Sequence, residues 1–98
     1  MLVSEEELNS EVVKVRVVYL GSLADILSVR FDYISLPRSD AYVKNLLKRL
    51  FELRPELREV EERIPLIQVF INGVEALPTT PLKEGDEVVL MPTLYEGG

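Results

Sequence analysis

One long stretch of the chain, residues 40–53, has the apolar spacing of an amphipathic helix, whereas most other apolar residues fall in short strand-like runs. Its apolar side chains recur at helical spacing: Val43, Leu46, Leu47 and Leu50. Ser39 or Asp40 is expected to cap this helix, because its side-chain oxygen can accept from a first-turn N–H. One face of the helix should pack and the other should meet water. A single helix of this kind is expected to cover a sheet built by the other segments.

Two strand-like segments precede the helix. Residues 12–20 alternate between apolar side chains on one side and a lysine and an arginine on the other. Residues 21–28 interrupt this pattern, and residues 29–36 resume it. Three side chains of the second segment share one side: Val29, Phe31 and Tyr33. We expect these two segments to form a hairpin with an irregular connection.

Three further segments after the helix indicate strands joined by tight turns. Residues 67–71 read as a strand, and Asn72-Gly73 favours a two-residue turn because both residues tolerate positive φ. Residues 74–77 are expected to be the short return strand. A second turn at residues 83–86 then leads to the last strand, residues 87–91.

Two charged segments carry weaker signals. Residues 1–11 form an acidic leader, for which we expect disorder or weak helicity. Residues 56–63 are expected to be a charged connector, with Leu57 and Val60 as its only apolar anchors. Neither segment is expected to contribute a strand or a main helix.

The order of these elements predicts an α+β fold of the ubiquitin-like β-grasp type, a mixed sheet with one main helix packed on one face. The first and last strands should lie side by side and parallel in the protected middle of the sheet. The predicted organisation is an acidic extension over residues 1–11, one domain over residues 12–92 and a flexible tail over residues 93–98. Nothing in the sequence suggests a second domain.

Composition excludes several kinds of function. The 98 residues are 47% hydrophobic, enough for one core. Eleven basic against seventeen acidic residues give a net charge of −6, which disfavours binding to nucleic acid. Cysteine and histidine are absent, which removes thiolate chemistry and the usual zinc ligands. No segment approaches a membrane span and no signal peptide is recognised, so we expect a cytoplasmic protein with no membrane partner and no bound cofactor or metal.

The sequence ends in Gly97-Gly98, and the reactive group proposed from the sequence is the main-chain carboxyl of Gly98. Glycine suits a tail that must enter an enzyme's active site, since its backbone can approach a partner closely. The alternative is an end that simply frays.

Several motifs together resemble a known family. Residues 69–73 (VFING), residues 80–88 (TPLKEGDEV), Pro92 and the terminal Gly97-Gly98 look like the small-subunit family of molybdopterin synthase and its ubiquitin-like sulfur-carrier relatives. The resemblance covers residues 12–98. It implies a sulfur-carrying subunit that has no independent catalytic site of its own.

The resemblance also implies a mechanism and partners. A ubiquitin-activating-type enzyme would use ATP to adenylate the Gly98 carboxylate, and a sulfur donor would displace AMP to leave a thiocarboxylate. The molybdopterin synthase large subunit would then accept Gly97, Glu96 and Tyr95 with the tail and pass the sulfur to a pterin precursor. Two carriers would be used for each dithiolene. Any molybdenum or tungsten would be held by the pterin and not by this chain.

Partner docking should also involve the sheet face away from the helix. Phe70 and Leu90 are expected to be exposed there, as bulky apolar residues that form a partner patch. In the alternative, the faces are reversed and both residues belong to the core. Carboxylates near the second turn are candidates for acidic contacts at the rim: Glu84, Asp86 and Glu87. Asp25 and Asp32 have no matching carboxylate, so no acid-base pair is assigned.

The tail departs from the family pattern and leaves other functions open. Residues 92–98 are one residue longer than usual, and Tyr95 and Glu96 must fit whichever channel receives them. A sulfur carrier for thiamine or for tRNA thiolation, or a ubiquitin-like modifier that forms isopeptide bonds, would use the same adenylation. A non-catalytic β-grasp interaction domain is the alternative from another class.

Overall fold

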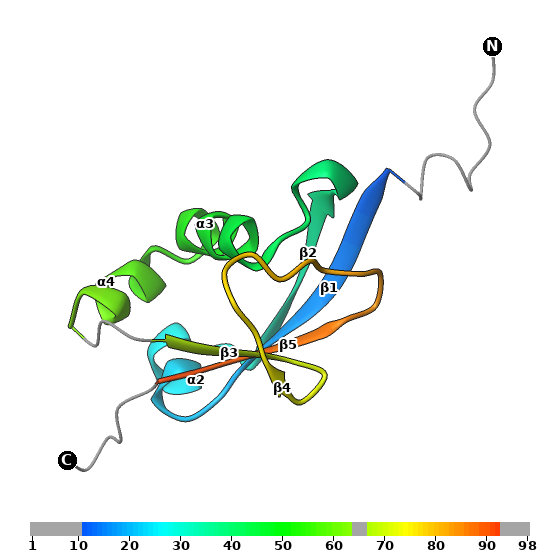
Figure 1. Cartoon of the computed structure of the whole chain (residues 1–98). Helices are drawn as coiled ribbons and strands as arrows, with labels where there is room; N and C mark the ends of the chain where they lie inside the picture. The colour runs from blue at the N-terminus through cyan, green and yellow to red at the C-terminus, as the bar shows by residue number, and fades with distance from the viewer. Residues whose placement is uncertain (1–10, 64–66, 93–98) are drawn as a thin grey trace.

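The computed structural model describes residues 11–63 and 67–92, with the backbone alone for residues 60–63. The strands are β1 (Val12–Tyr19), β2 (Phe31–Pro37), β3 (Ile67–Ile71), β4 (Val74–Glu75) and β5 (Glu87–Pro92). The helical elements are α2 (Ser22–Leu27), the short 3-10 helix η1 (Arg38–Asp40), α3 (Val43–Leu53) and α4 (Pro55–Arg63). The predicted tail and residues 1–10 of the predicted acidic extension lie outside the described residues. Figure 1 shows α3 and α4 together on one side of the twisted sheet.

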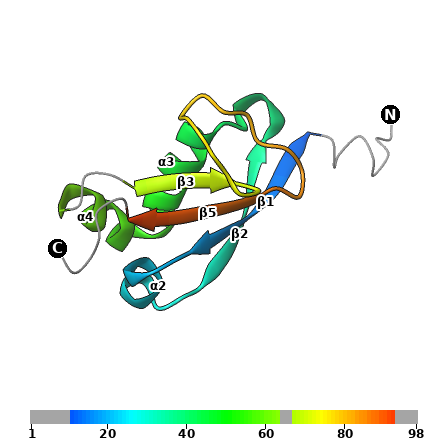
Figure 2. The same ribbon diagram turned by 60° about the horizontal axis from the view of Figure 1, so that its bottom comes forward.

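The five strands form one mixed sheet in the order β2-β1-β5-β3-β4. β1 and β5 are parallel neighbours at its centre, with Val17 opposite Val88 and Tyr19 opposite Leu90. The other neighbouring strands are antiparallel (Figure 2). This topology confirms the predicted ubiquitin-like β-grasp fold, including the central parallel pair.

Alternation along β1 decides which face of the sheet is buried. Lys14 and Arg16 are exposed on one face. The intervening side chains are at most 2% exposed: Val13, Val15, Val17 and Tyr19. They belong to one apolar cluster with Leu46 and Leu50 of α3, both fully buried. Burial of each such side chain stabilises the fold by about 1.5–3 kcal/mol before conformational entropy is subtracted, so the cluster is the main source of stability.

The main helix begins later than the sequence predicted, and no side chain caps it. Tyr42 is the N-cap residue and makes no side-chain capping bond. The N–H groups of Val43 and Lys44 instead donate to the carbonyl oxygens of Thr80 and Pro78, over 3.1 and 3.0 Å. The predicted cap at Ser39 or Asp40 is therefore wrong, because backbone carbonyls of a distant loop accept from the first-turn N–H groups and those two residues belong to η1.

Two segments that were expected to be irregular are helical. Residues 55–63 form α4, with Pro55 at its first position, where a missing N–H costs nothing. Leu57 is fully buried, and this anchor attaches a mostly charged helix to the core. Residues 22–27 form α2, whose Leu23 and Leu27 are both buried one turn apart. Burial of these leucines favours the helical conformation. The charge of residues 56–63 and the break in alternation at residues 21–28 had favoured irregular segments.

The two predicted tight turns lie together and are tied by side chains. Asn72 and Gly73 have φ values of 49° and 86°, the pair of positive angles that a two-residue hairpin turn requires. The Asn72 side chain donates to Asp86 Oδ1 over 3.0 Å and accepts from the Glu87 N–H over 3.1 Å. This cross-link fixes the start of β5 beside the β3–β4 hairpin.

Candidate functional site

The predicted reactive residue Gly98 and its neighbours Gly97, Glu96 and Tyr95 lie outside the described residues. The structure does describe the strand that leads to them. β5 ends at Pro92 in the middle of the sheet, beside α2 (Figure 1). The N–H of Leu20 donates to the carbonyl of Leu90 over 3.0 Å, which ties the end of β1 to the end of β5. Pro92, the last described residue before the predicted tail, therefore ends a strand that pairs with β1 on one side and with β3 on the other.

Gly21 marks the point where the chain turns beside the end of β5. Its φ is 59°, and a Cβ built on it would lie 3.8 Å from Cδ of Pro92. That distance is an ordinary contact, so the positive φ is what favours glycine here. The turn lets α2 begin next to Pro92 without displacing it.

The structure places Phe70 on the predicted face, although it is only partly exposed there, and contradicts the predicted exposure of Leu90. Phe70 pairs with Val89 and lies partly buried on the sheet face opposite the helices. Leu90 pairs with Val69 and is fully buried in the core. Residues 88–91 are all apolar, so the sequence gives no alternation that fixes the faces of this strand. Val89 and Met91, which are partly exposed, share the open face with Phe70.

Aromatic and basic side chains extend this open face across β1 and β2. Phe31 and Tyr33 pack edge to face with ring centroids 5.7 Å apart. Lys14 Nζ lies 5.0 Å from the Tyr33 ring centroid, and the Arg16 guanidinium lies 4.7 Å from that of Phe31. Cations above ring faces are attracted by the π electrons. The sequence placed Phe31 and Tyr33 on one side of a strand but did not identify that side as the open face.

The predicted rim carboxylates already have partners within the turns. Glu84 Oε1 accepts from the N–H of Lys14 over 2.9 Å, and Asp86 Oδ2 accepts from the N–H of Lys83 over 2.8 Å. Glu87 lies 3.6 Å from Arg16. All three therefore hold the start of β5 against its neighbours. Rim contacts with a partner stay a prediction.

A polar cluster joins β1, β2 and the end of α3. Arg54 donates to both carboxylate oxygens of Asp32, over 2.9 and 2.7 Å, and the Tyr19 hydroxyl donates to Asp32 Oδ2 over 2.6 Å. The hydrogen bond from Arg54 lowers the pKa of Asp32, whereas burial raises the pKa of Tyr19 above its usual value. The two donors occupy both oxygens of the carboxylate, so the cluster is structural and not a general base.

Within the described ranges, no group of three metal-ligating side chains comes together. No helix in those ranges is long and apolar enough to cross a bilayer.

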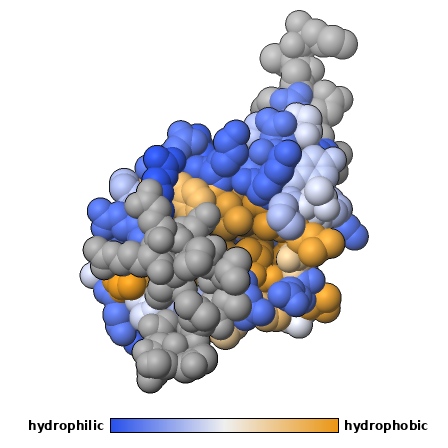
Figure 3. Space-filling model, turned by 60° about the vertical axis from the view of Figure 1, so that its left-hand side comes forward, coloured by the Kyte–Doolittle hydropathy of each residue, from blue (hydrophilic) through white to orange (hydrophobic). Residues whose placement is uncertain are grey.

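An apolar groove lies between α3 and β3, near the edge of the sheet that β4 forms. Its apolar lining residues are Val43, Leu47, Ile67, Val69, Ala76 and Pro78. Figure 3 shows an apolar band between hydrophilic areas on the side of the molecule that it presents. We assign no ligand to this groove.

The sheet order, the parallel central pair and the helices on one face define a ubiquitin-like β-grasp protein. The chain is similar to SAMP1 of Haloferax volcanii, with a TM-score of 0.73 and 25% identity over 87% of this chain and 99% of that one. It is also similar to a candidate molybdopterin converting factor subunit 1 of Pyrococcus furiosus, with a TM-score of 0.71 and 25% identity over 84% and 99% of the two chains.

The small archaeal modifier protein 1 of Methanosarcina acetivorans shares the fold, with a TM-score of 0.70 and 22% identity over 89% of this chain and 98% of that one. No protein-family model matches the chain, and no curated protein matches it. The structural neighbours confirm the resemblance to the ubiquitin-like sulfur-carrier family that the motifs indicated.

Proposed function

We propose that this protein is a ubiquitin-like carrier, and that the Gly98 carboxyl becomes a thiocarboxylate that donates sulfur. The favoured acceptor is a pterin precursor in molybdopterin biosynthesis. The observation that supports this most is the β-grasp fold shared with a candidate molybdopterin converting factor subunit, in a chain with a Gly97-Gly98 tail.

The proposed chemistry needs no side-chain catalyst in this protein. A carboxylate is a poor acyl electrophile, and attack of its oxygen on the α-phosphorus of ATP releases pyrophosphate and leaves an acyl adenylate. A donor that delivers sulfur as hydrosulfide then attacks the carbonyl carbon; the bond from that carbon to the AMP oxygen breaks, AMP departs, and the sulfur loses its proton to leave a thiocarboxylate. ATP is used by the activating enzyme and is not bound by the carrier. A chain without cysteine or histidine can take part in each step.

The geometry of β5 supports this role. Gly98 is the sixth residue after Pro92, and a segment of six residues reaches at most about 20 Å when extended. The domain would therefore dock close to the active site that receives Gly98. Phe70 of β3 and Val89 of β5 lie next to each other on the open face, and β5 is the strand that leads to the tail. We propose this face as the docking surface for the activating enzyme and for the synthase large subunit.

Intact mass spectrometry tests the proposal. The purified protein is mixed with ATP, a ubiquitin-activating-type enzyme and a sulfur donor, and a gain of about 16 Da is expected as sulfur replaces oxygen. A variant without Gly98 should show no gain. Phe70→Asp should slow the reaction with its circular dichroism spectrum unchanged, whereas Val74→Asp, the same kind of change at an exposed position on the other face of β4, is the matched control. An unchanged mass with an enzyme shown to be active on its own carrier would favour a non-catalytic interaction domain.

A second candidate is a protein modifier, because the neighbour from Haloferax volcanii is a small archaeal modifier protein. In this role the activated Gly98 carbonyl would be attacked by a lysine Nζ of a target, with loss of AMP or of an enzyme thiol. Conjugates that resist thiol reagents and contain Gly98 in isopeptide linkage would support modification. A mass gain without conjugates would support sulfur transfer.

A further inference from the structure

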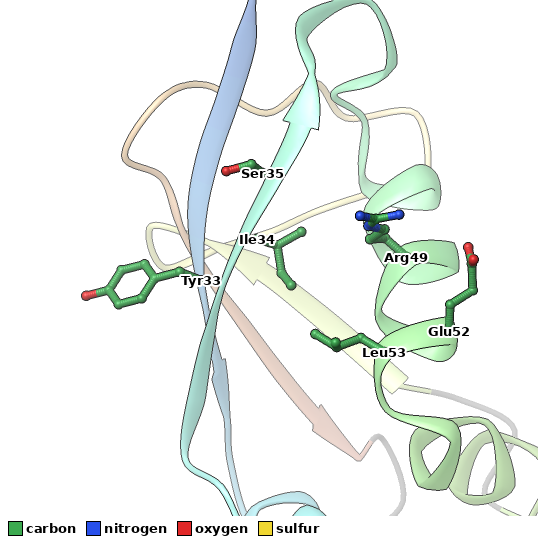
Figure 4. A pocket seen from close by; sticks show the side chains of 6 residues that line it. All are labelled: Tyr33, Ile34, Ser35, Arg49, Glu52 and Leu53. Carbon is green, nitrogen blue, oxygen red and sulfur yellow. The ribbon is translucent and has the colours of Figure 1, made fainter. Parts of the chain in front are cut away.

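A groove between β2 and α3 is lined by charges of both signs. It measures about 410 Å³, and Ile34 and Leu53 point toward each other across it (Figure 4). Arg49 and Glu52 also line it, so their opposite charges do not select one kind of ligand, and we assign none. A more specific chemistry lies at the other edge of the sheet, in the turn that joins β3 to the edge strand β4.

This turn consists of Asn72 and Gly73, both of which are exposed. Asparagine is one of the chemically labile residues, because its side-chain amide can react with the next backbone nitrogen. Glycine has no side chain to hinder that nitrogen. A Cβ built on Gly73 would meet nothing within 4 Å, so the described neighbours do not crowd this residue. The pair that favours a tight turn is therefore also a candidate for modification.

The reaction consumes only water. The backbone nitrogen of Gly73 loses its proton and attacks Cγ of Asn72; the bond from Cγ to Nδ2 breaks and ammonia departs. The cyclic imide that results then takes up one water molecule. Opening of the imide at Cγ gives aspartate in a normal backbone, whereas opening at the main-chain carbonyl carbon gives isoaspartate, whose backbone is longer by one carbon. Each product carries a carboxylate that asparagine lacks.

The folded chain holds the Asn72 amide against the start of β5. Nδ2 of Asn72 donates to Oδ1 of Asp86 over 3.0 Å, and Oδ1 of Asn72 accepts from the Glu87 N–H over 3.1 Å. The Asn72 N–H also donates to the Glu87 carbonyl over 3.0 Å. Attack on Cγ places negative charge on Oδ1, which the neighbouring carboxylate of Asp86 disfavours. These contacts oppose the reaction that the sequence favours.

An aspartate at position 72 could not replace the amide. It could accept from the Glu87 N–H, but it has no N–H to donate to Asp86. Asp86 is itself fixed in its turn, since its Oδ2 accepts from the Lys83 N–H over 2.8 Å. Two carboxylates would then face each other in place of a hydrogen bond, and like charges at this separation repel.

We propose that Asn72 is a deamidation site that Asp86 and Glu87 keep slow in the folded chain, and that its deamidation releases the β3–β4 hairpin from the start of β5. Loss of ammonia makes the change irreversible, so the site limits the chemical lifetime of each molecule. The proposal does not depend on the carrier function, because it involves no residue of the predicted tail.

Peptide mapping by mass spectrometry measures the reaction in the full chain. The protein is incubated at mildly alkaline pH, either folded or in concentrated guanidinium chloride. A gain of about 1 Da at Asn72 should appear at least about tenfold faster in the unfolded chain, where two side-chain hydrogen bonds no longer hold the amide. Asn45, which precedes the bulky Leu46, is the internal control and should react far more slowly in both samples. Equal rates at Asn72 in the two samples would overturn the proposal.

Two variants test whether Asp86 protects the amide. Asp86→Ala removes the acceptor of Nδ2 and should speed deamidation of the folded chain about fivefold or more. Glu84→Ala makes the same change in charge in the same turn, but its carboxylate accepts from the Lys14 N–H, so the rate at Asn72 should stay close to that of the wild type. Equal acceleration by both variants would contradict a specific role for Asp86.

A pair of substitutions tests the effect of the product. Asn72→Asp reproduces the aspartate product and should lower the midpoint of thermal unfolding by about 4–8 °C. Adding Asp86→Asn exchanges donor and acceptor across the same contact and restores the net charge of the wild type, so most of the loss should be recovered. An unchanged midpoint for Asn72→Asp, or no recovery in the double variant, would show that deamidation does not act through this contact.

Discussion

Arg54 and Asp32 are joined by two parallel hydrogen bonds, although they are 22 residues apart in the chain. Arg54 follows the last residue of α3 and Asp32 lies near the start of β2, so the pair fastens the helix to the sheet. The side chains are 26% and 14% exposed, which leaves little water to compete with the interaction. The Tyr19 hydroxyl adds β1 to the same junction.

Asp32→Asn is expected to lower the free energy of unfolding at pH 7 by about 2 kcal/mol, because the partly buried guanidinium of Arg54 loses its charged acceptor. Tyr19→Phe should cost about 1 kcal/mol, through the loss of one hydrogen bond. Urea denaturation measures both changes. Asp25→Asn, at an exposed position on α2, is the control. Equal stability of the Asp32 and Asp25 variants would show that the junction contributes nothing.

The same pair predicts how stability depends on pH. The folded state lowers the pKa of Asp32 below its usual value near 4, so its contribution is present above about pH 4 and is lost as the pH falls through the folded-state pKa. The folded state raises the pKa of Tyr19, so the contribution of the neutral phenol is lost as the pH rises above about 10. The stability difference between wild type and Asp32→Asn should therefore shrink below pH 3. Denaturation series at pH 7 and pH 2.5 measure this difference. An equal difference in the free energy of unfolding at both pH values would contradict the proposed role of the ionised Asp32.

Leu90→Ala should destabilise the domain by about 2–5 kcal/mol, because it opens a cavity among buried side chains. The neighbouring Val89→Ala removes atoms from the open face and should cost about 1 kcal/mol or less. Thermal unfolding of the two variants compares the faces of β5 directly. The reverse order of stabilities would mean that Leu90, and not Val89, belongs to the exposed surface.

Gly73→Ala tests the turn between β3 and β4. A Cβ at this position would meet nothing within 4 Å, so any penalty comes from the backbone angle of +86°. About 1 kcal/mol of destabilisation is expected, since alanine is strained in this region and glycine is not. Chemical denaturation would detect this loss. A variant as stable as the wild type would indicate that the hairpin turn relaxes at no cost.

Local patterns predicted much of the fold. The alternation in β1 and the Asn72-Gly73 turn act within a few residues, and both were recognised in the sequence. The central parallel pair followed from the need to protect the first and last strands. The phase of β5 could not be read from residues 88–91, because every position is apolar and the packing against β1 and β3 selects the buried face.

Features that depend on distant contacts were missed. The α4 segment is charged, and burial of Leu57 against the core makes it a helix. The first turn of α3 is capped by loop carbonyls that come more than thirty residues later, so the cap at Asp40 was misassigned. The Asp32–Arg54 pair and the groove between β2 and α3 exist only once the helix lies across the sheet. For the candidate site, the sequence placed Phe70 on the correct sheet face and Leu90 on the wrong one, whereas the predicted tail lies outside the described residues.

The position of β5 between β1 and β3 also has a mechanical consequence. Traction on the chain beyond Pro92, directed along the strand, would load the hydrogen bonds on both flanks of β5 in shear. Bonds loaded in shear resist together, whereas the bonds of an edge strand peeled sideways break one after another. An enzyme that grips the end of this chain and draws it into a narrow channel would therefore pull on the part of the sheet best built to withstand the force.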